Sequence, residues 1–258
     1  MILTIDVGNT SIKTALFNGA EMECYWRIAT NRSMSSDEYG ILMANLLSYN
    51  NKNASDVTGI IISSVVPSVN FTIEHMCRSY FDRDPMLVAP GIKTGINLKY
   101  ENPRELGSDR IANAVAAYEI YGGPNVFIDF GTATTFGAMS KKGEFLGGVI
   151  CPGLKLAAEA LVEHASKLPR FELQKPVNVL GRNTVANLQS GIVYGCVGQV
   201  QYLIAKIKDE MNAPAAKVIA TGGLGLLVAG ETESINVLDG LLTLKGLRLI
   251  YEKNTDQL

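Results

Sequence analysis

The chain has 258 residues, 47% of them apolar and 19% charged, so it is long enough for two domains of about 100–150 residues each and is not a disordered polymer. Its formal net charge of −2 provides no broad basic field, which argues against nucleic acid or an anionic membrane as a partner. No apolar stretch reaches the ~20 residues of a membrane span, and the first residues lack a signal-peptide pattern, so we expect a cytoplasmic protein.

The four cysteines are widely spaced, without a CxxC pair, and only two histidines are present. This pattern favours structural thiols in a reducing compartment over disulfides or a zinc site.

Two segments near the starts of the two halves resemble each other. Residues 2–19 and residues 126–143 both read as an apolar strand that ends in Asp-x-Gly, a Thr/Ser-rich turn, a second strand and a glycine turn. The aspartates of the two motifs, Asp6 and Asp129, are 129 − 6 = 123 residues apart, close to half of the chain. A duplicated domain is the economical interpretation, although two similar hairpins could also arise by chance.

A third strand follows each hairpin, at Glu23–Ile28 and at Phe145–Ile150, and helices and strands then alternate. The expected helices are Ser36–Tyr49, Val69–Tyr80, Ser108–Tyr121, Gly153–His164, Asn183–Met211 with an interruption at Gly191–Gly198, and one beginning at Leu226. The expected strands are Thr58–Ser63, Pro85–Val88 and Lys217–Thr221, and residues 90–106 read as irregular. The pattern predicts an α/β protein with mixed sheets, divided at a Gly-Gly-Pro break into domains 1–121 and 122–258.

The first Asp-x-Gly turn has the composition of an anion-binding loop. Its residues are Asp6, Val7, Gly8, Asn9, Thr10, Ser11, Ile12 and Lys13. Gly8 allows backbone N–H groups to approach a phosphate, the polar side chains add donors, and Lys13 could reach the same anion. Asp6 suits Mg²⁺, which binds through one or two carboxylates and phosphate oxygens. The alternative is an ordinary polar hairpin turn.

Two elements of the second half could complete such a site. Asp129 could hold a cation, while Gly131 and the Thr132 hydroxyl could bind phosphate; a Thr-rich β-turn is the alternative. Gly222 and Gly223 follow a strand and could lie flat against an adenine or a ribose, although a bare Gly-Gly turn is the favoured interpretation of this segment taken alone. The chain contains neither G-x-x-x-x-G-K-[ST] nor a complete G-x-G-x-x-G, so a nucleotide site would be neither a P-loop nor a dinucleotide fold.

The segment from Leu106 to Arg110 places an acid at the start of a helix. Asp109 there could accept a proton from a substrate hydroxyl, and Arg110 could pair with a substrate carboxylate or phosphate. A capped helix start with a local Asp–Arg pair is the alternative.

These motifs together resemble type III pantothenate kinases, members of the acetate and sugar kinase/Hsc70/actin superfamily. The resemblance covers nearly the whole chain in the right order. It rests on residues 6–10, 106–110, 129–135, 147–153, 181–184, 189–192, 221–223 and 244–251. It implies two duplicated actin-like (ribonuclease H-like) domains with the active site in the interdomain cleft.

The resemblance also implies ATP-dependent phosphorylation of pantothenate to 4'-phosphopantothenate, the first step of coenzyme A synthesis. Asp109 would be the general base, Asp6 would organise Mg²⁺, and Asp129 would bind K⁺ or NH₄⁺. ATP would contact residues 6–13, Thr132 and the two glycines Gly222 and Gly223. Pantothenate would contact Tyr100, Gly107, Ser108, Asp109, Arg110 and Thr184. Family members are homodimers, and the long helix near residues 184–208 is a candidate interface, although Ala/Gly-rich helices also pack within one chain.

Two other functions stay open at this point. One is a non-catalytic regulatory or binding module on the same fold; the other is a kinase for a different small hydroxyl substrate. The presence of all three aspartates, Asp6, Asp109 and Asp129, favours catalysis, because a module without catalysis has no physical need for them.

Overall fold

The computed structural model describes residues 1–255 and divides into two compact units. The first contains Met1–Gly95, Glu101–Ala116 and, among the described residues, 242–255; the second contains Ile96–Tyr100 and Ala117–Leu241. The division expected from sequence left the C-terminal segment with the second half. In the structure this segment forms helix α7 (Leu242–Thr255), which contacts β1, β2 and β4 of the first unit and buries Leu244, Leu247 and Ile250.

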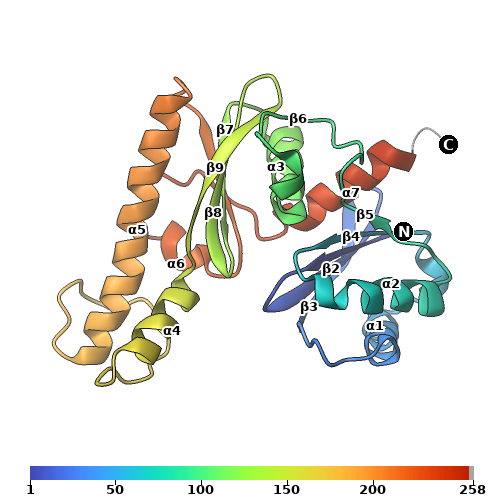
Figure 1. Ribbon diagram of the computed structural model, residues 1–258, viewed down its shortest axis with the longest axis horizontal. Coiled ribbons are helices and arrows are strands. Elements are labelled where there is room, and N and C mark those ends of the chain that lie inside the picture. Colours follow the sequence, from blue (N-terminus) through green and yellow to red (C-terminus); the bar gives the residue numbers. More distant parts are fainter. Residues whose placement is uncertain (256–258) are drawn as a thin grey trace. The chain divides into compact units, whose positions relative to one another are not determined.

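The first unit is built on a five-stranded mixed sheet in the order β3-β2-β1-β4-β5. Its strands are β1 (Ile2–Val7), β2 (Ser11–Asn18), β3 (Glu21–Ala29), β4 (Gly59–Ser64) and β5 (Met86–Leu87). The first three form an antiparallel meander, whereas β4 runs parallel to β1 and β5 runs parallel to β4. The carboxyl ends of β1 and β4 therefore lie side by side (Figure 1).

The two faces of this sheet carry different helices. Helices α1 (Ser36–Tyr49) and α2 (Pro67–Phe81) cover one face, where alternate β1 residues join a hydrophobic core with Met43 and Ile73. A capping box between Ser35 and Glu38 fixes the start of α1. The opposite face carries Asp6 and is covered by α7. On that face, the guanidinium of Arg248 in α7 lies 5.8 Å from the centre of the Phe17 ring in β2.

The second unit is built on a six-stranded mixed sheet in the order β11-β10-β7-β8-β9-β6. Its strands are β6 (Asn97–Leu98), β7 (Asn125–Phe130), β8 (Ala133–Met139), β9 (Glu144–Pro152), β10 (Lys217–Thr221) and β11 (Val237–Leu238). Strands β7, β8 and β9 form the antiparallel meander, and β10 runs parallel to β7. The segment expected to be irregular supplies β6, which pairs with β9, and a 3₁₀ turn at Pro103–Glu105.

Three helices pack on one face of the second sheet: α4 (Leu154–His164), α5 (Thr184–Glu210) and α6 (Gly225–Ala229). The expected interruption of α5 is wrong, because this helix is continuous. Gly191, Gly195 and Gly198 lie on its exposed side, whereas Val193, Val197 and Val200 are buried. Burial of that apolar side offsets the helix penalty of about 1 kcal/mol per glycine.

The duplication predicted from the hairpin motifs is confirmed. If the strands of each repeat are numbered along the chain, both sheets have the spatial order third, second, first, fourth, fifth. The antiparallel and parallel pairings are also the same. Only the additional β6 at the edge of the second sheet distinguishes them. Helix α3 (Ser108–Tyr121) contributes its first residues to the first unit and its last residues to the second.

The close approach of α7 to α3 depends on Gly246. A Cβ atom at this position would lie 1.9 Å from the Ala112 carbonyl oxygen, which is backbone and cannot rotate away. We therefore expect Gly246→Ala to lower the free energy of unfolding by about 1–3 kcal/mol, measured by denaturant titration. Gly240→Ala is the control, because a Cβ atom there meets no atom within 4 Å. Equal stability of the two variants would contradict this packing argument.

Candidate functional site

The turn between β1 and β2 brings together the residues predicted to bind phosphate. Asp6 lies near the end of β1 and is 7% exposed, and Lys13 Nζ on β2 lies 3.7 Å from its Oδ2 atom. The Gly8 N–H donates to the Ser11 carbonyl oxygen at 3.1 Å, and a Cβ atom on Gly8 would lie 3.1 Å from the same oxygen. The turn thus brings a carboxylate and a cation beside a tight backbone hairpin.

The start of α3 is attached to the strand beside this turn. Asp6 on β1 pairs in parallel register with Ser63 on β4, so their side chains share the face that α7 covers. The hydroxyl oxygens of Ser63 and Ser108 lie 2.9 Å apart. Ser108 Oγ also accepts from the Ser64 N–H at 3.1 Å. The structure therefore brings the segment Gly107–Arg110 beside the β1–β2 turn.

Asp109 and Arg110 occupy the first turn of α3. The Asp109 carboxylate accepts a hydrogen bond from the Arg110 backbone N–H at 2.8 Å, and Arg110 is 7% exposed. A Cβ atom on Gly107 would lie 2.5 Å from Asp109 Oδ1, so glycine leaves room for this carboxylate.

The second unit gathers the other Asp-x-Gly turn and the Gly-Gly turn. Asp129 pairs with Thr221 on β10 and with Thr135 on β8, so these three side chains share one face of the sheet. Gly222 has a φ of +96°, and a Cβ atom there would lie 2.6 Å from Asp129 Oδ1. The Gly-Gly turn therefore lies directly against Asp129.

The loop that holds Thr132 is closed by the start of α4. The Gly153 N–H donates to the Thr132 carbonyl oxygen at 3.2 Å, and a Cβ atom on Gly153 would lie 2.3 Å from that oxygen. Gly153 ends the motif at residues 147–153 that resembles the kinase family, but its packing against the Thr132 loop is visible only in the folded structure.

Two residues predicted to bind substrate lie in the second unit. Tyr100 follows β6, and the centre of its ring lies 6.1 Å from that of Phe145. Thr184 is the exposed first residue of α5, which Asn183 caps by accepting from the Ala186 N–H at 2.9 Å. Gly107–Arg110 belong to the first unit. That all of these residues line one pocket stays a prediction, as does the interdomain position of the active site.

Among residues 1–255, no three His, Cys, Asp or Glu side chains form a group that could hold a metal ion by themselves.

All four cysteines are free thiols, and burial raises the pKa of Cys77 to about 12 and that of Cys196 to about 11. Both thiols are therefore protonated near neutral pH and are poor nucleophiles.

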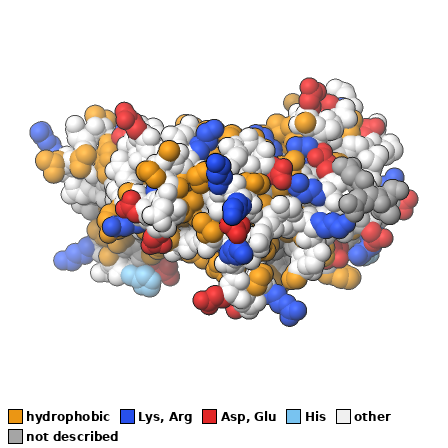
Figure 2. All heavy atoms as spheres, turned by 90° about the horizontal axis from the view of Figure 1, so that it is seen from above, with side chains coloured by type: hydrophobic (Ala, Val, Ile, Leu, Met, Phe, Trp, Pro, Cys, Tyr) orange, Lys and Arg blue, Asp and Glu red, His pale blue; other side chains and the backbone are white. Residues whose placement is uncertain are grey.

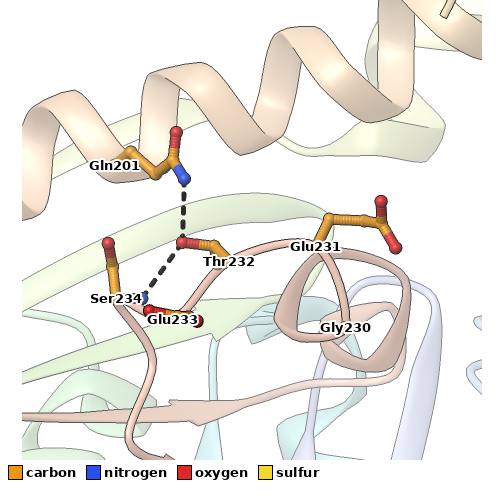
Figure 3. A pocket seen from close by; sticks show the side chains of 6 residues that line it. All are labelled: Gln201, Gly230, Glu231, Thr232, Glu233 and Ser234. Carbon is orange, nitrogen blue, oxygen red and sulfur yellow. Dashed lines mark hydrogen bonds between the residues drawn. The ribbon is translucent and has the colours of Figure 1, made fainter.

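One cavity of about 670 Å³ lies elsewhere in the second unit, between α5 and the segment after α6 (Figure 3). The Gln201 side-chain amide donates to Thr232 Oγ1 at 3.1 Å across it. Its lining is Gln201, Gly230, Glu231, Thr232, Glu233 and Ser234, which includes none of the predicted site residues.

On the face that Figure 2 shows, acidic and basic side chains are interspersed, in line with the small net charge. In residues 1–255 no helix has both the length and the apolar character needed to span a bilayer.

Solved structures with the same fold include several sugar kinases. A 2-dehydro-3-deoxygalactonokinase protein from Sinorhizobium meliloti matches with a TM-score of 0.59 at 11% identity, over 98% of this chain and 96% of its own. The ROK hexokinase from Thermus thermophilus matches with a TM-score of 0.51 at 14% identity, over 99% of both chains. A conserved protein from Campylobacter jejuni, assigned by name to the Baf family of transcriptional activators, matches with a TM-score of 0.63 at 22% identity, over 98% and 99%.

These identities are low, so the neighbours support the fold only. They confirm that this chain has the expected actin-like architecture, which sugar kinases share. The family model of type III pantothenate kinase matches residues 2–206, well over half of the 258 residues. This range includes the β1–β2 turn, the start of α3 and the Asp129 turn. The chain therefore belongs to the type III pantothenate kinase family.

Proposed function

We propose that this kinase transfers the γ-phosphate of ATP to the primary hydroxyl of pantothenate, the first step of coenzyme A synthesis. One observation carries the proposal: the start of α3, with Asp109 and Arg110, is bonded to the strand beside Asp6. An acceptor hydroxyl at Asp109 would then lie near phosphates bound at the β1–β2 turn. Phosphoryl transfer depends chiefly on such positioning and on charge stabilisation.

In this proposal each residue at the start of α3 has its own task. The Asp109 carboxylate orients the pantothenate hydroxyl and accepts its proton as the new O–P bond forms, while the bond from the γ-phosphorus to the β–γ bridging oxygen breaks and ADP leaves. The Arg110 guanidinium pairs with the pantothenate carboxylate, since its planar fork matches a carboxylate. Gly107 and Ser108 line the same segment, while Tyr100 and Thr184 complete the substrate contacts that the family resemblance implies.

The nucleotide would be held by residues of both Asp-x-Gly turns. Residues 6–13 and Thr132 would donate to the phosphates, and Gly222 and Gly223 would lie against the adenosine. Asp6 fits Mg²⁺ because that ion needs only one or two carboxylates besides phosphate oxygens and water. When bound, Mg²⁺ would neutralise charge on the phosphate oxygens.

The surroundings of Asp129 fit a monovalent cation. Thr221 lies on the same face of the sheet and is only 1% exposed. Its hydroxyl oxygen, Oγ1, makes no hydrogen bond within residues 1–255. A buried hydroxyl oxygen without a donor can serve as a cation ligand together with a carboxylate. This supports the assignment of Asp129 to K⁺ or NH₄⁺.

A regulatory module is the second candidate, because a neighbour of the same fold carries the name of a transcriptional activator family. One assay separates the candidates: ADP release from ATP with Mg²⁺ and K⁺, with and without pantothenate. Release that requires pantothenate supports the kinase proposed here. Release without pantothenate would indicate hydrolysis, with water as the acceptor, and no turnover would favour the module or a kinase for another hydroxyl substrate. A cytoplasmic location stays a prediction.

The general base can be tested by Asp109→Asn, which keeps the shape of the side chain but removes the proton acceptor. We expect kcat to fall about 10²- to 10⁴-fold while the Kd for ATP stays near the wild-type value. Steady-state kinetics and calorimetric titration of ATP measure the two quantities. Wild-type turnover by this variant would exclude Asp109 as the base.

The cation assignment predicts a specific requirement. Turnover in a buffer with Na⁺ as the only monovalent cation should fall to background, and K⁺ or NH₄⁺ should restore it. Asp129→Ala should remove this restoration, because it removes the charged ligand. Full activity of the wild type in the Na⁺ buffer would contradict the role proposed for Asp129.

We also propose that the protein is a homodimer, as the family resemblance implies, and that it associates through α5. Gly191, Gly195 and Gly198 leave open space on the exposed side of this helix, and Tyr202 is 64% exposed. Small residues in such a row allow close approach of a second helix. Light scattering should give twice the mass of one chain, and Gly195→Arg should reduce it to that of a single chain. A wild-type mass of one chain would contradict the proposal.

A further inference from the structure

Two arginines that follow the β1–β2 turn in sequence contact the side chains of that turn. Arg27 Nε on β3 donates to Ser11 Oγ at 3.0 Å. Arg32 Nη2, a few residues beyond the end of β3, donates to Asn9 Oδ1 at 3.4 Å. Both arginines are solvent exposed. The predicted nucleotide site included neither of them.

The strand register places Arg27 in one row with Asp6 and Lys13. Asp6 on β1 pairs with Lys13 on β2, and Lys13 pairs with Arg27 on β3. Directly paired residues of adjacent strands point to the same face, and Ser11 shares this face because it lies two residues before Lys13. The arginine side chain therefore lies on the same face of the sheet as the predicted Mg²⁺ ligand.

The positive charges of these arginines are not neutralised by carboxylates. Within residues 1–255, neither Arg27 nor Arg32 forms an ion pair, and the oxygen that each contacts is neutral. Arg78, by contrast, pairs with Glu74 and Asp84. A guanidinium has five N–H donors and no acceptor, so one bond to a neutral oxygen leaves most donors and the full charge for an anion.

Thr30 fastens the segment that carries both arginines to the turn itself. Its hydroxyl donates to the Gly8 carbonyl oxygen at 2.6 Å, and its N–H donates to the Thr10 carbonyl oxygen at 3.2 Å. The arginines are thereby held beside the loop before any ligand arrives. Such preorganised cations bind an anion with less loss of conformational entropy.

We infer that Arg27 and Arg32 bind the polyphosphate tail of a nucleoside triphosphate at the β1–β2 turn, together with Lys13. The inference rests on the proposed function, because it takes ATP as the ligand of this turn. It adds two charged donors to a site for which the whole chain, with its net charge of −2, supplies no general attraction. Thr30 acts as a positioning residue for the same loop.

The test is calorimetric titration of MgATP, without pantothenate, into the wild type, Arg27→Gln and Arg32→Gln. We expect each substitution to raise the Kd for ATP about tenfold or more, because each removes a charge-assisted hydrogen bond to phosphate. Arg27→Lys should recover part of the affinity, since it keeps the charge. In turnover assays the KM for ATP should rise while the KM for pantothenate stays the same.

Arg78→Gln is the matched control, because it removes an exposed guanidinium of the same unit that is already paired with carboxylates. Its Kd for ATP should equal that of the wild type. Wild-type affinity in both Arg27→Gln and Arg32→Gln would overturn the inference. A wild type that binds ATP but never phosphorylates pantothenate would sink the proposed substrate and leave the inference standing, whereas a wild type without ATP affinity would overturn both.

Discussion

The parallel pairing of β1 with β4 is the constraint on which the candidate site of the first unit depends. It sets Asp6 opposite Ser63, and the Ser63 hydroxyl bonds to Ser108 at the start of α3. Asp6 and Asp109 are 109 − 6 = 103 residues apart in the chain, yet this one register brings their segments together. A slip of one residue would turn Asp6 into the core with α1 and α2, where a buried carboxylate without partners is strongly unfavourable.

The duplicated halves keep the same topology but differ in the chemistry around the shared aspartate. In the first unit, the strand partner of Asp6 is the cation Lys13, and Arg27 continues the row. In the second unit, the strand partners of Asp129 are Thr135 and Thr221, whose hydroxyls are neutral. A turn rich in cations suits an anion, whereas a carboxylate beside hydroxyl oxygens suits a cation. The divergence of the repeats therefore matches the different ligands proposed for the two turns.

Glycines mark the places where backbone must approach backbone or a carboxylate. Gly222 and Gly153 hold the Gly-Gly turn and the start of α4 against the Asp129 loop, because any Cβ atom would collide there. Gly246 does the same where α7 meets α3. The exposed glycines of α5 have open space around them instead, so the same residue type reports close packing in one place and an open surface in another.

The sequence by itself determined the elements whose signals are local. The Asp-x-Gly hairpins, the helix that begins at Ser108 and the strand that ends at Thr221 could all be predicted, because alternation, turn residues and helix starts are properties of neighbouring residues. The repeat of one motif also predicted the duplication, and the ordered motifs indicated the family that the comparison confirmed.

Only the tertiary structure decided the relations between distant segments. Three relations were not foreseen from the sequence. They are the packing of α7 with the first unit, the continuity of α5 through three glycines, and the contacts of Arg27 and Arg32 with the turn. The helix packing results from burial of one helix face, the Arg27 contact follows the strand register, and the Arg32 contact lies in the loop after β3. All of these contacts join residues that no local pattern connects. An exposed arginine in a strand looks the same in sequence whether it faces solvent or a phosphate loop, and pairing with a neighbouring strand determines which.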